Sequence, residues 1–122
     1  MALTIVKRPL SGATAGLPIK INTTSTTSGL IHLVNSSSLI TDEVFLFASL
    51  DQTQTEAMTM TLNINSQCYA VVVPRLSLNY PILSGYYIQG NTSASNGSRI
   101  EIYACATNNL HIGGYVHRVT ES

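Results

Sequence analysis

The chain has few charged residues. Only 12 of its 122 residues are Asp, Glu, Lys or Arg, six of each sign, so the charged fraction is 10% and the formal net charge is zero. An ordinary soluble domain has a charged fraction of about 25%. A neutral chain lacks the basic surface of a nucleic-acid-binding protein, and 44% hydrophobic residues exclude the composition of a disordered one. We therefore expect a folded domain without a nucleic-acid partner.

Long apolar runs are also missing. No segment approaches the roughly 20 consecutive apolar residues that a membrane helix needs. The opening stretch, MALTIVKRPLSG, places its basic pair after a short apolar run, which is not the pattern of a signal peptide. We expect no membrane partner. Ser and Thr together make up 28 of the 122 residues, so the polar surface consists mainly of hydroxyl and amide groups.

Cysteine is scarce, and tryptophan is absent. Cys68 and Cys105 both stand in apolar, strand-like surroundings and form no CxxC pair. Free cysteine is among the most buried residue types, which favours two reduced thiols in the core. A disulfide between them remains the alternative, and it requires that their two strands lie side by side.

The residue combinations of common catalytic sites are missing as well. The chain has no GxSxG turn and no phosphate-binding loop. Asp42 and Glu43 are adjacent, so they point to opposite faces of a strand rather than forming a carboxylate pair. His32, His111 and His117 are scattered and lie at no relay spacing from an acid. We expect no catalytic residues, no cofactor and no metal site.

What the sequence does contain is a series of β-strand patterns. Residues 56–64 (EAMTMTLNI) alternate strictly, with Met58, Met60, Leu62 and Ile64 on one face. Similar segments are predicted at the ranges 3–7, 28–34, 42–50, 67–73, 86–89, 99–106 and 110–119. Short strands separated by polar turns predict an all-β protein: a single β-sandwich, jelly-roll or immunoglobulin-like, of about eight mostly antiparallel strands.

Two hairpins are predicted from the short polar turns between these segments. One joins residues 42–50 to 56–64 through DQTQT, and the other joins 99–106 to 110–119 through TNN. Gly113 and Gly114 lie inside the last strand, which indicates a bulge or a close approach of two backbones.

The N-terminal 20 residues differ from the rest, which forms the sandwich domain at residues 21–122. They contain Lys7, Arg8 and Lys20 but no acid, and two prolines and two glycines interrupt them. We expect an extended N-terminal arm or edge segment that attaches the chain to a partner. In contrast, residues 42–56 carry four acids, including Asp42 and Glu43. These two acids, together with the consecutive tyrosines Tyr86 and Tyr87, are candidate interface residues.

Two stretches resemble a known group of proteins: TDEVFLFASLDQTQTEAMTMTL at 41–62 and IEIYACATNNLHIGGYVHRVT at 100–120. The sequence resembles small β-rich structural proteins encoded near the head genes of tailed bacteriophages, especially phages of cyanobacteria and marine bacteria. The resemblance covers about half of the chain. It implies a capsid decoration, or cement, protein that forms trimers on the virion head and braces the major capsid protein.

The attachment role of the N-terminal segment can be tested by truncation. If residues 3–20 form the attachment arm, deleting residues 2–18 should abolish binding to empty heads and leave the sandwich folded. Two other classes stay open. A phage tail, baseplate or fibre component would use the same kind of domain. A carbohydrate-binding module would use Tyr80, Tyr86 or Tyr87 to stack on sugar rings, although the absence of tryptophan argues against it.

Overall fold

Antiparallel strands make up almost all of the regular structure. The computed structural model describes residues 3–21, 29–34, 37–90, 98–104 and 109–121. The strands of these ranges are β1 (Leu3–Pro9), β2 (Ile19–Ile21), β3 (Leu30–Val34), β4 (Ile40–Leu50), β5 (Met58–Ile64), β6 (Gln67–Val73), β7 (Tyr80–Gln89), β8 (Ser98–Ala104) and β9 (Leu110–Glu121). Within the described ranges no segment is helical, so none forms a helix that could span a membrane.

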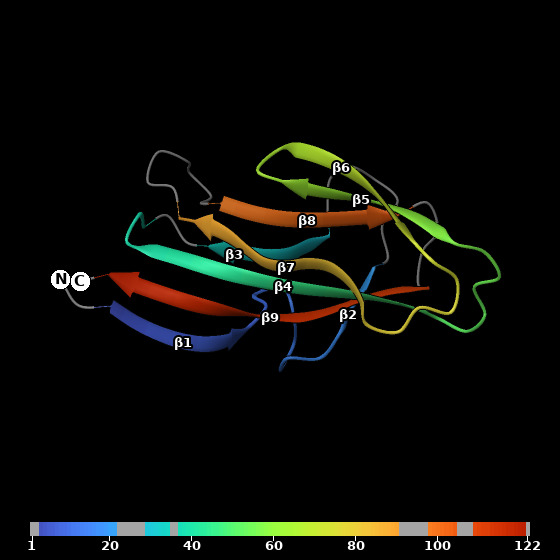
Figure 1. Cartoon of the computed structure of the whole chain (residues 1–122), viewed down its shortest axis with the longest axis horizontal. Helices are drawn as coiled ribbons and strands as arrows, with labels where there is room; N and C mark the ends of the chain where they lie inside the picture. The colour runs from blue at the N-terminus through green and yellow to red at the C-terminus, as the bar shows by residue number, and fades with distance from the viewer. Residues whose placement is uncertain (1–2, 22–28, 35–36, 91–97, 105–108, 122) are drawn as a thin grey trace.

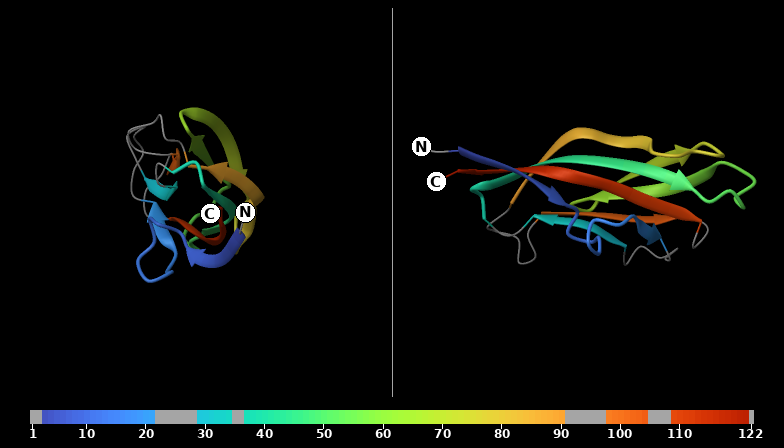
Figure 2. Two further views of the ribbon diagram at one scale, coloured as in Figure 1. Left: turned by 90° about the vertical axis from the view of Figure 1, so that its left-hand side faces the viewer. Right: turned by 90° about the horizontal axis from the view of Figure 1, so that it is seen from below.

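The strands form two sheets that pack face to face (Figures 1 and 2). One sheet has the order β1-β9-β4-β7, and the short β2 pairs with the first residues of β9, before the part that pairs with β1. The other sheet has the order β3-β8-β5-β6. The first sheet is called the five-stranded sheet below, and the second the four-stranded sheet. The predicted β-sandwich is confirmed.

The pairing pattern identifies the sandwich more closely. If β1 and β2 count as one strand, the outermost strands of the chain pair with each other, and each inner pair follows: β1 and β2 with β9, β3 with β8, β4 with β7, and β5 with β6. Successive pairs alternate between the two sheets. This is a long antiparallel ribbon rolled into two layers, the jelly-roll arrangement. Of the two sandwich types expected, the chain adopts the jelly roll.

The roll explains why both predicted hairpins are wrong. β4 belongs to the five-stranded sheet and β5 to the four-stranded sheet, and the same division separates β9 from β8. Between β4 and β5, and again between β8 and β9, the next described strand therefore lies in the other sheet rather than beside the preceding one. Sequentially adjacent strands form a hairpin at β5–β6, where Asn65 and Ser66 have φ values of 49° and 73°. Positive φ at both positions is the requirement of a type I′ turn.

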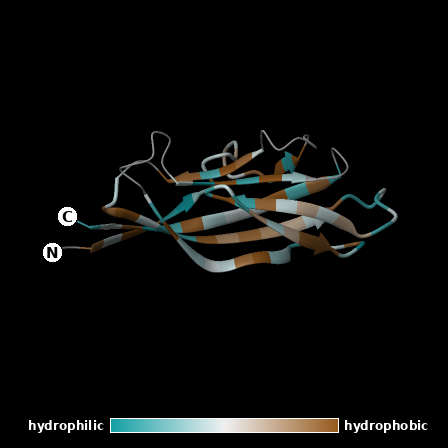
Figure 3. Ribbon diagram, turned by 90° about the horizontal axis from the view of Figure 1, so that it is seen from above, coloured by the Kyte–Doolittle hydropathy of each residue, from teal (hydrophilic) through white to brown (hydrophobic). Residues whose placement is uncertain are grey.

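The core lies between the two sheets and follows the predicted alternation. Met58 and Met60 are fully buried, and Leu62 and Ile64 nearly so. Figure 3 shows hydrophobic and polar bands alternating along the strands. The opposite sheet contributes the inward residues of β4 and β9 to the same cluster: Val44, Leu46, Ala48, Leu50, Leu110, Ile112 and Val116.

The N-terminal segment is an edge strand. β1 pairs with β9 over its whole length, from Leu3 opposite Glu121 to Pro9 opposite Tyr115. Leu10, immediately after β1, is buried in the core at 2% exposure. Deletion of residues 2–18 would therefore remove a strand and a core side chain, so this truncation cannot serve as a test that leaves the sandwich intact.

Two smaller sequence predictions also have clear outcomes. Gly114 has φ of 153°, and a Cβ at this position would lie 2.0 Å from the carbonyl oxygen of Phe45 on β4. The predicted close backbone approach is thus present, and the ladder between β4 and β9 continues through it without a bulge. Cys68 is exposed, and it lies opposite Asn63 on the face of β5 that points away from the core, so its predicted burial is wrong. Cys105 lies outside the described residues.

Candidate functional site

Four side chains from four strands form a row across the outer face of the five-stranded sheet. The ladder register places Lys7 of β1 opposite His117 of β9, His117 opposite Glu43 of β4, and Glu43 opposite Tyr87 of β7. We call these four residues the outer row. It contains three of the predicted attachment and interface residues, and it forms because side chains at the same register position of a sheet share a face.

Glu43 holds the outer row together. Its Oε1 lies 3.1 Å from Nδ1 of His117. The hydrogen bond between Tyr87 and Glu43, assisted by the negative charge of the carboxylate, raises the pKa of the Tyr87 phenol above its ordinary value of 10.0. Tyr87 is nevertheless 65% exposed. The row therefore presents an ordered aromatic hydroxyl to the solvent.

An aromatic cluster adjoins the outer row on the same face. The rings of Phe45 and Tyr115 stack with centroids 4.9 Å apart, and His117 meets Phe45 edge-on at 5.4 Å. The ammonium group of Lys7 lies 4.5 Å from the centroid of the Tyr115 ring. Cation–π contact of this kind orients the cation over the sheet. Lys7 is thus part of an ordered surface rather than of a free arm.

Asp42 is not available as an interface residue. It points inward from β4 and is completely buried. Arg118 lies opposite it on β9 and donates two hydrogen bonds, from Nε to Oδ1 at 2.9 Å and from Nη2 to Oδ2 at 3.0 Å. His32 reaches Asp42 Oδ2 from the other sheet, with Nε2 at 2.5 Å. Asp42 therefore connects the two layers through a buried ionic network.

The pKa of Asp42 reflects these contacts. Burial alone raises the pKa of its carboxyl, but the hydrogen bonds from His32 and Arg118 and the Coulombic attraction of Arg118 outweigh burial, so the pKa is lowered below 3.8. The same pairing, through the hydrogen bond to Asp42, raises the pKa of Arg118. A buried acid with two donors is held in its ionised form.

Ser11, His32 and Asp42 are the residue types of a hydrolase triad, so their geometry matters. Nδ1 of His32 accepts a hydrogen bond from the backbone N–H of Ser11 at 3.1 Å, which places the ring proton on Nε2, toward Asp42. The hydroxyl oxygen of Ser11 accepts the N–H of Leu33 at 2.6 Å. The lone pair that a general base would use is therefore occupied by a backbone N–H. In this arrangement Ser11 joins the β1–β2 segment to β3, and the bond between His32 and Asp42 joins β3 to β4.

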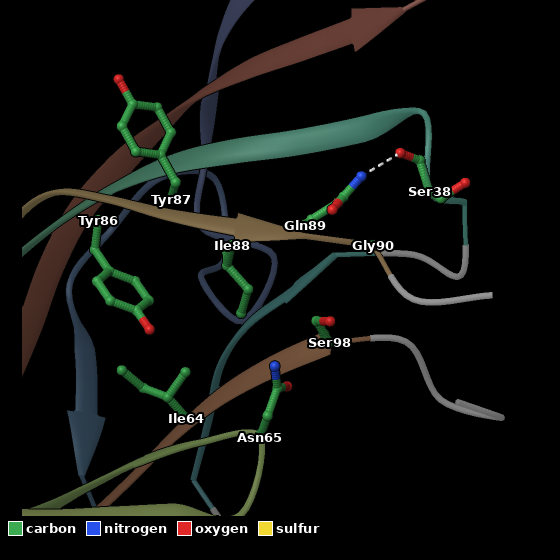
Figure 4. A pocket seen from close by; sticks show the side chains of 9 residues that line it. All are labelled: Ser38, Ile64, Asn65, Tyr86, Tyr87, Ile88, Gln89, Gly90 and Ser98. Carbon is green, nitrogen blue, oxygen red and sulfur yellow. Dashed lines mark hydrogen bonds between the residues drawn. The ribbon is translucent and has the colours of Figure 1, made fainter. Parts of the chain in front are cut away.

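Tyr86 and Tyr87 point to opposite sides of β7 (Figure 4). Tyr86 is 41% exposed and turns toward Ile64 across the open edge of the sandwich, whereas Tyr87 turns to the outer face. Tyr86 lines a pocket of about 460 Å³ that also includes Gln89, whose Nε2 donates a hydrogen bond to the Ser38 carbonyl at 2.7 Å. The tyrosine pair does not form one stacking surface.

The other two predicted attachment residues, Lys20 and Arg8, lie apart from each other. Lys20, on β2, is opposite His111, toward the end of the sheet where β9 begins. Arg8 is exposed on β1 and lines a pocket together with Arg118. The predicted attachment residues are therefore distributed over two faces of one sheet. Among the described residues, no group of three or more His, Cys, Asp or Glu side chains is placed to hold a metal ion.

The free edge of the five-stranded sheet is the most exposed element. All seven residues of β1 are exposed, and they include three large hydrophobic side chains: Leu3 at 59%, Ile5 at 67% and Val6 at 47%. Within the described chain, β1 pairs only with β9, which leaves its other edge without a backbone partner. Natural proteins usually shorten, charge or cover such edges.

Comparison with known proteins gives no relative. No protein-family model, no curated protein and no solved structure matches the chain.

Proposed function

We propose that the chain is a structural virion protein: a decoration protein that binds the outside of a tailed-phage head and braces neighbouring copies of the major capsid protein. The observation that carries the proposal is the free edge of β1, which is exposed over seven residues and rich in apolar side chains. An edge of this kind is suited to pairing with a strand of another chain.

The composition supports an assembly role. A chain with only 12 charged side chains loses little ion solvation when its surface is buried against a shell or another copy. Jelly rolls occur in viral capsids and also in lectins, so the fold by itself does not select between these functions. The proposal also includes a trimer, located on the virion and made in the host cytoplasm.

The trimer has a geometric consequence. Pairing of β1 with β1 of another copy gives a two-fold dimer, because such a contact uses the same patch on both subunits. A closed trimer instead needs β1 to contact a different surface of the next copy. We therefore place β1 against a second surface, either of the neighbouring copy or of the capsid subunit.

Binding to heads that lack the protein tests the proposal. The full chain should sediment with such heads, and Ile5→Lys should reduce binding at least tenfold, because it adds charge at the free edge. Leu78→Lys is the matched control, since Leu78 is 81% exposed outside the strands and should bind as the unsubstituted chain does. Equal binding of both variants would show that β1 is not part of the attachment surface. A failure of the unsubstituted chain to bind would contradict the decoration function.

A carbohydrate-binding function is the second candidate, because Phe45 and Tyr115 form an ordered aromatic cluster beside the exposed Tyr87. Aromatic rings on a flat sheet face can stack on sugar rings. A glycan array with the unsubstituted chain and with Tyr87→Ala distinguishes the two functions. Binding of a glycan that is lost in Tyr87→Ala would favour the carbohydrate function over attachment to a head.

A further inference from the structure

A pocket of about 490 Å³ lies on the inner side of the β1–β9 pair, next to the segment that follows β1. Its polar lining residues include Arg8, Arg118 and Ser11, and its apolar lining residues include Pro9, Leu10 and Ala13. The outer row lies on the opposite face of the same sheet, so this pocket is separate from that surface.

The ladder register places the backbones of Arg8 and Arg118 close to each other. Val6 is opposite Arg118 and Arg8 is opposite Val116, so Arg8 and Arg118 are diagonal neighbours on one face of the β1–β9 pair. Arg118 is fixed in place because Asp42 receives two of its hydrogen bonds. An arginine that is held before a ligand arrives loses less conformational entropy on binding.

The charges of the pocket do not cancel. Asp42 balances Arg118, but within the described part of the chain Arg8 makes no ion pair and no hydrogen bond. The paired guanidinium of Arg118 uses two of its five N–H groups for Asp42 and retains three. With His32 donating from Nε2 to Asp42, the pocket carries one uncompensated positive charge.

We propose that this pocket is a binding site for a small carboxylate with a short apolar substituent. The guanidinium groups of Arg8 and Arg118 bind the carboxylate oxygens, and the hydroxyl of Ser11, whose oxygen already accepts the Leu33 N–H, donates its proton to one of them. The apolar substituent packs on Pro9, Leu10 and Ala13. One net positive charge matches a monoanion, and the apolar wall distinguishes a carboxylic acid from inorganic phosphate.

The test is a titration of the ¹⁵N-labelled full chain with butyrate at neutral pH and constant ionic strength. The backbone N–H signals of Ser11, Leu33 and Arg118 should shift in a saturable way. Arg8→Gln should weaken binding about fivefold, as expected for loss of a partly exposed ion pair. Because Arg8 is exposed, this variant should stay folded. Arg75→Gln is the matched control, since it removes an exposed arginine after β6, away from the pocket lining.

Butanol and inorganic phosphate complete the experiment. Butanol, which has the same apolar group without the charge, should give no saturable shift at these signals, and phosphate should bind more weakly than butyrate. The proposal is overturned if butyrate produces no saturable shift, if Arg8→Gln binds butyrate as tightly as Arg75→Gln does, or if butanol or phosphate binds as tightly as butyrate. None of these results bears on attachment to a head, so the two proposals are tested separately.

Discussion

At the scale of single residues, Asp42 contributes most to joining the two layers. Asp42→Asn should lower the free energy of unfolding by about 3 kcal/mol or more. The amide NH₂ group of Asn would face an N–H donor of His32 or Arg118, and the substitution would leave both residues without an anionic partner. Urea unfolding at neutral pH measures the change. Glu43→Gln is the control from the adjacent position, and it should cost within about 1 kcal/mol because Glu43 is partly exposed.

The pH dependence follows from the same carboxyl. The pKa of Asp42 is lower in the folded chain than the ordinary value of 3.8. A lowered folded-state pKa stabilises the fold fully above the unfolded-state pKa, and the contribution is lost as the pH falls through the folded-state value. The stability gap between the unsubstituted chain and Asp42→Asn should therefore narrow between about pH 5 and pH 2. A gap that stays constant over this range would contradict the ionised network.

Gly114 provides a second test at this scale. Gly114→Ala should cost at least about 2 kcal/mol in unfolding free energy, because the added Cβ would lie 2.0 Å from the Phe45 carbonyl oxygen at a φ of 153°. Gly113→Ala is the neighbouring control, since no atom lies within 4 Å of its added Cβ. Thermal unfolding of the two variants should separate them, and equal melting temperatures would show that the β4–β9 backbones are not in close contact.

At the scale of elements, local alternation located most of the strands but did not pair them, and it missed β2 and the first six residues of β7. The range 67–73 was predicted to its end residues, and the buried face of β5 was predicted residue by residue. The hairpins were wrong because a short polar turn has the same sequence whether it reverses a strand or crosses the sandwich. Pairing β4 with β7 and β9 depends on contacts between residues far apart in the chain.

The candidate site was predictable only in part, for the same reason. Alternation correctly placed Asp42 and Glu43 on opposite faces, but it could not show which face was buried at Asp42. An acid at an inward position of an otherwise apolar strand is the signal that was available, because such an acid requires a partner. The partners, His32 and Arg118, are 10 and 76 positions away in the sequence, so no local motif could reveal them.

We expect the trimer to depend on β1. Light scattering after size-exclusion chromatography should show a trimer for the unsubstituted chain and a monomer for Ile5→Lys. Ile5 is 67% exposed, so this substitution should leave the unfolding free energy nearly unchanged while it places a charge in the contact. A trimer that persists in Ile5→Lys would show that β1 does not form the contact between subunits.

At the scale of the whole molecule, charge is sparse but unevenly placed. The five-stranded sheet contains the outer row, the buried Asp42–Arg118 pair and the free β1 edge, and β1 contributes Lys7 to the outer row and Ile5 to the free edge. The described N- and C-terminal strands lie side by side, with Leu3 opposite Glu121 at the proposed attachment edge (Figure 1). The zero net charge therefore says less about function than the position of each charge does.

The most direct test of the proposed function is a reconstruction of the virion that carries this protein, at a resolution that resolves strands. We expect jelly-roll density on the outside of the head, with β1 against a capsid subunit or a neighbouring copy. Jelly-roll density in the tail, baseplate or fibres, or its absence from the particle, would contradict the decoration function.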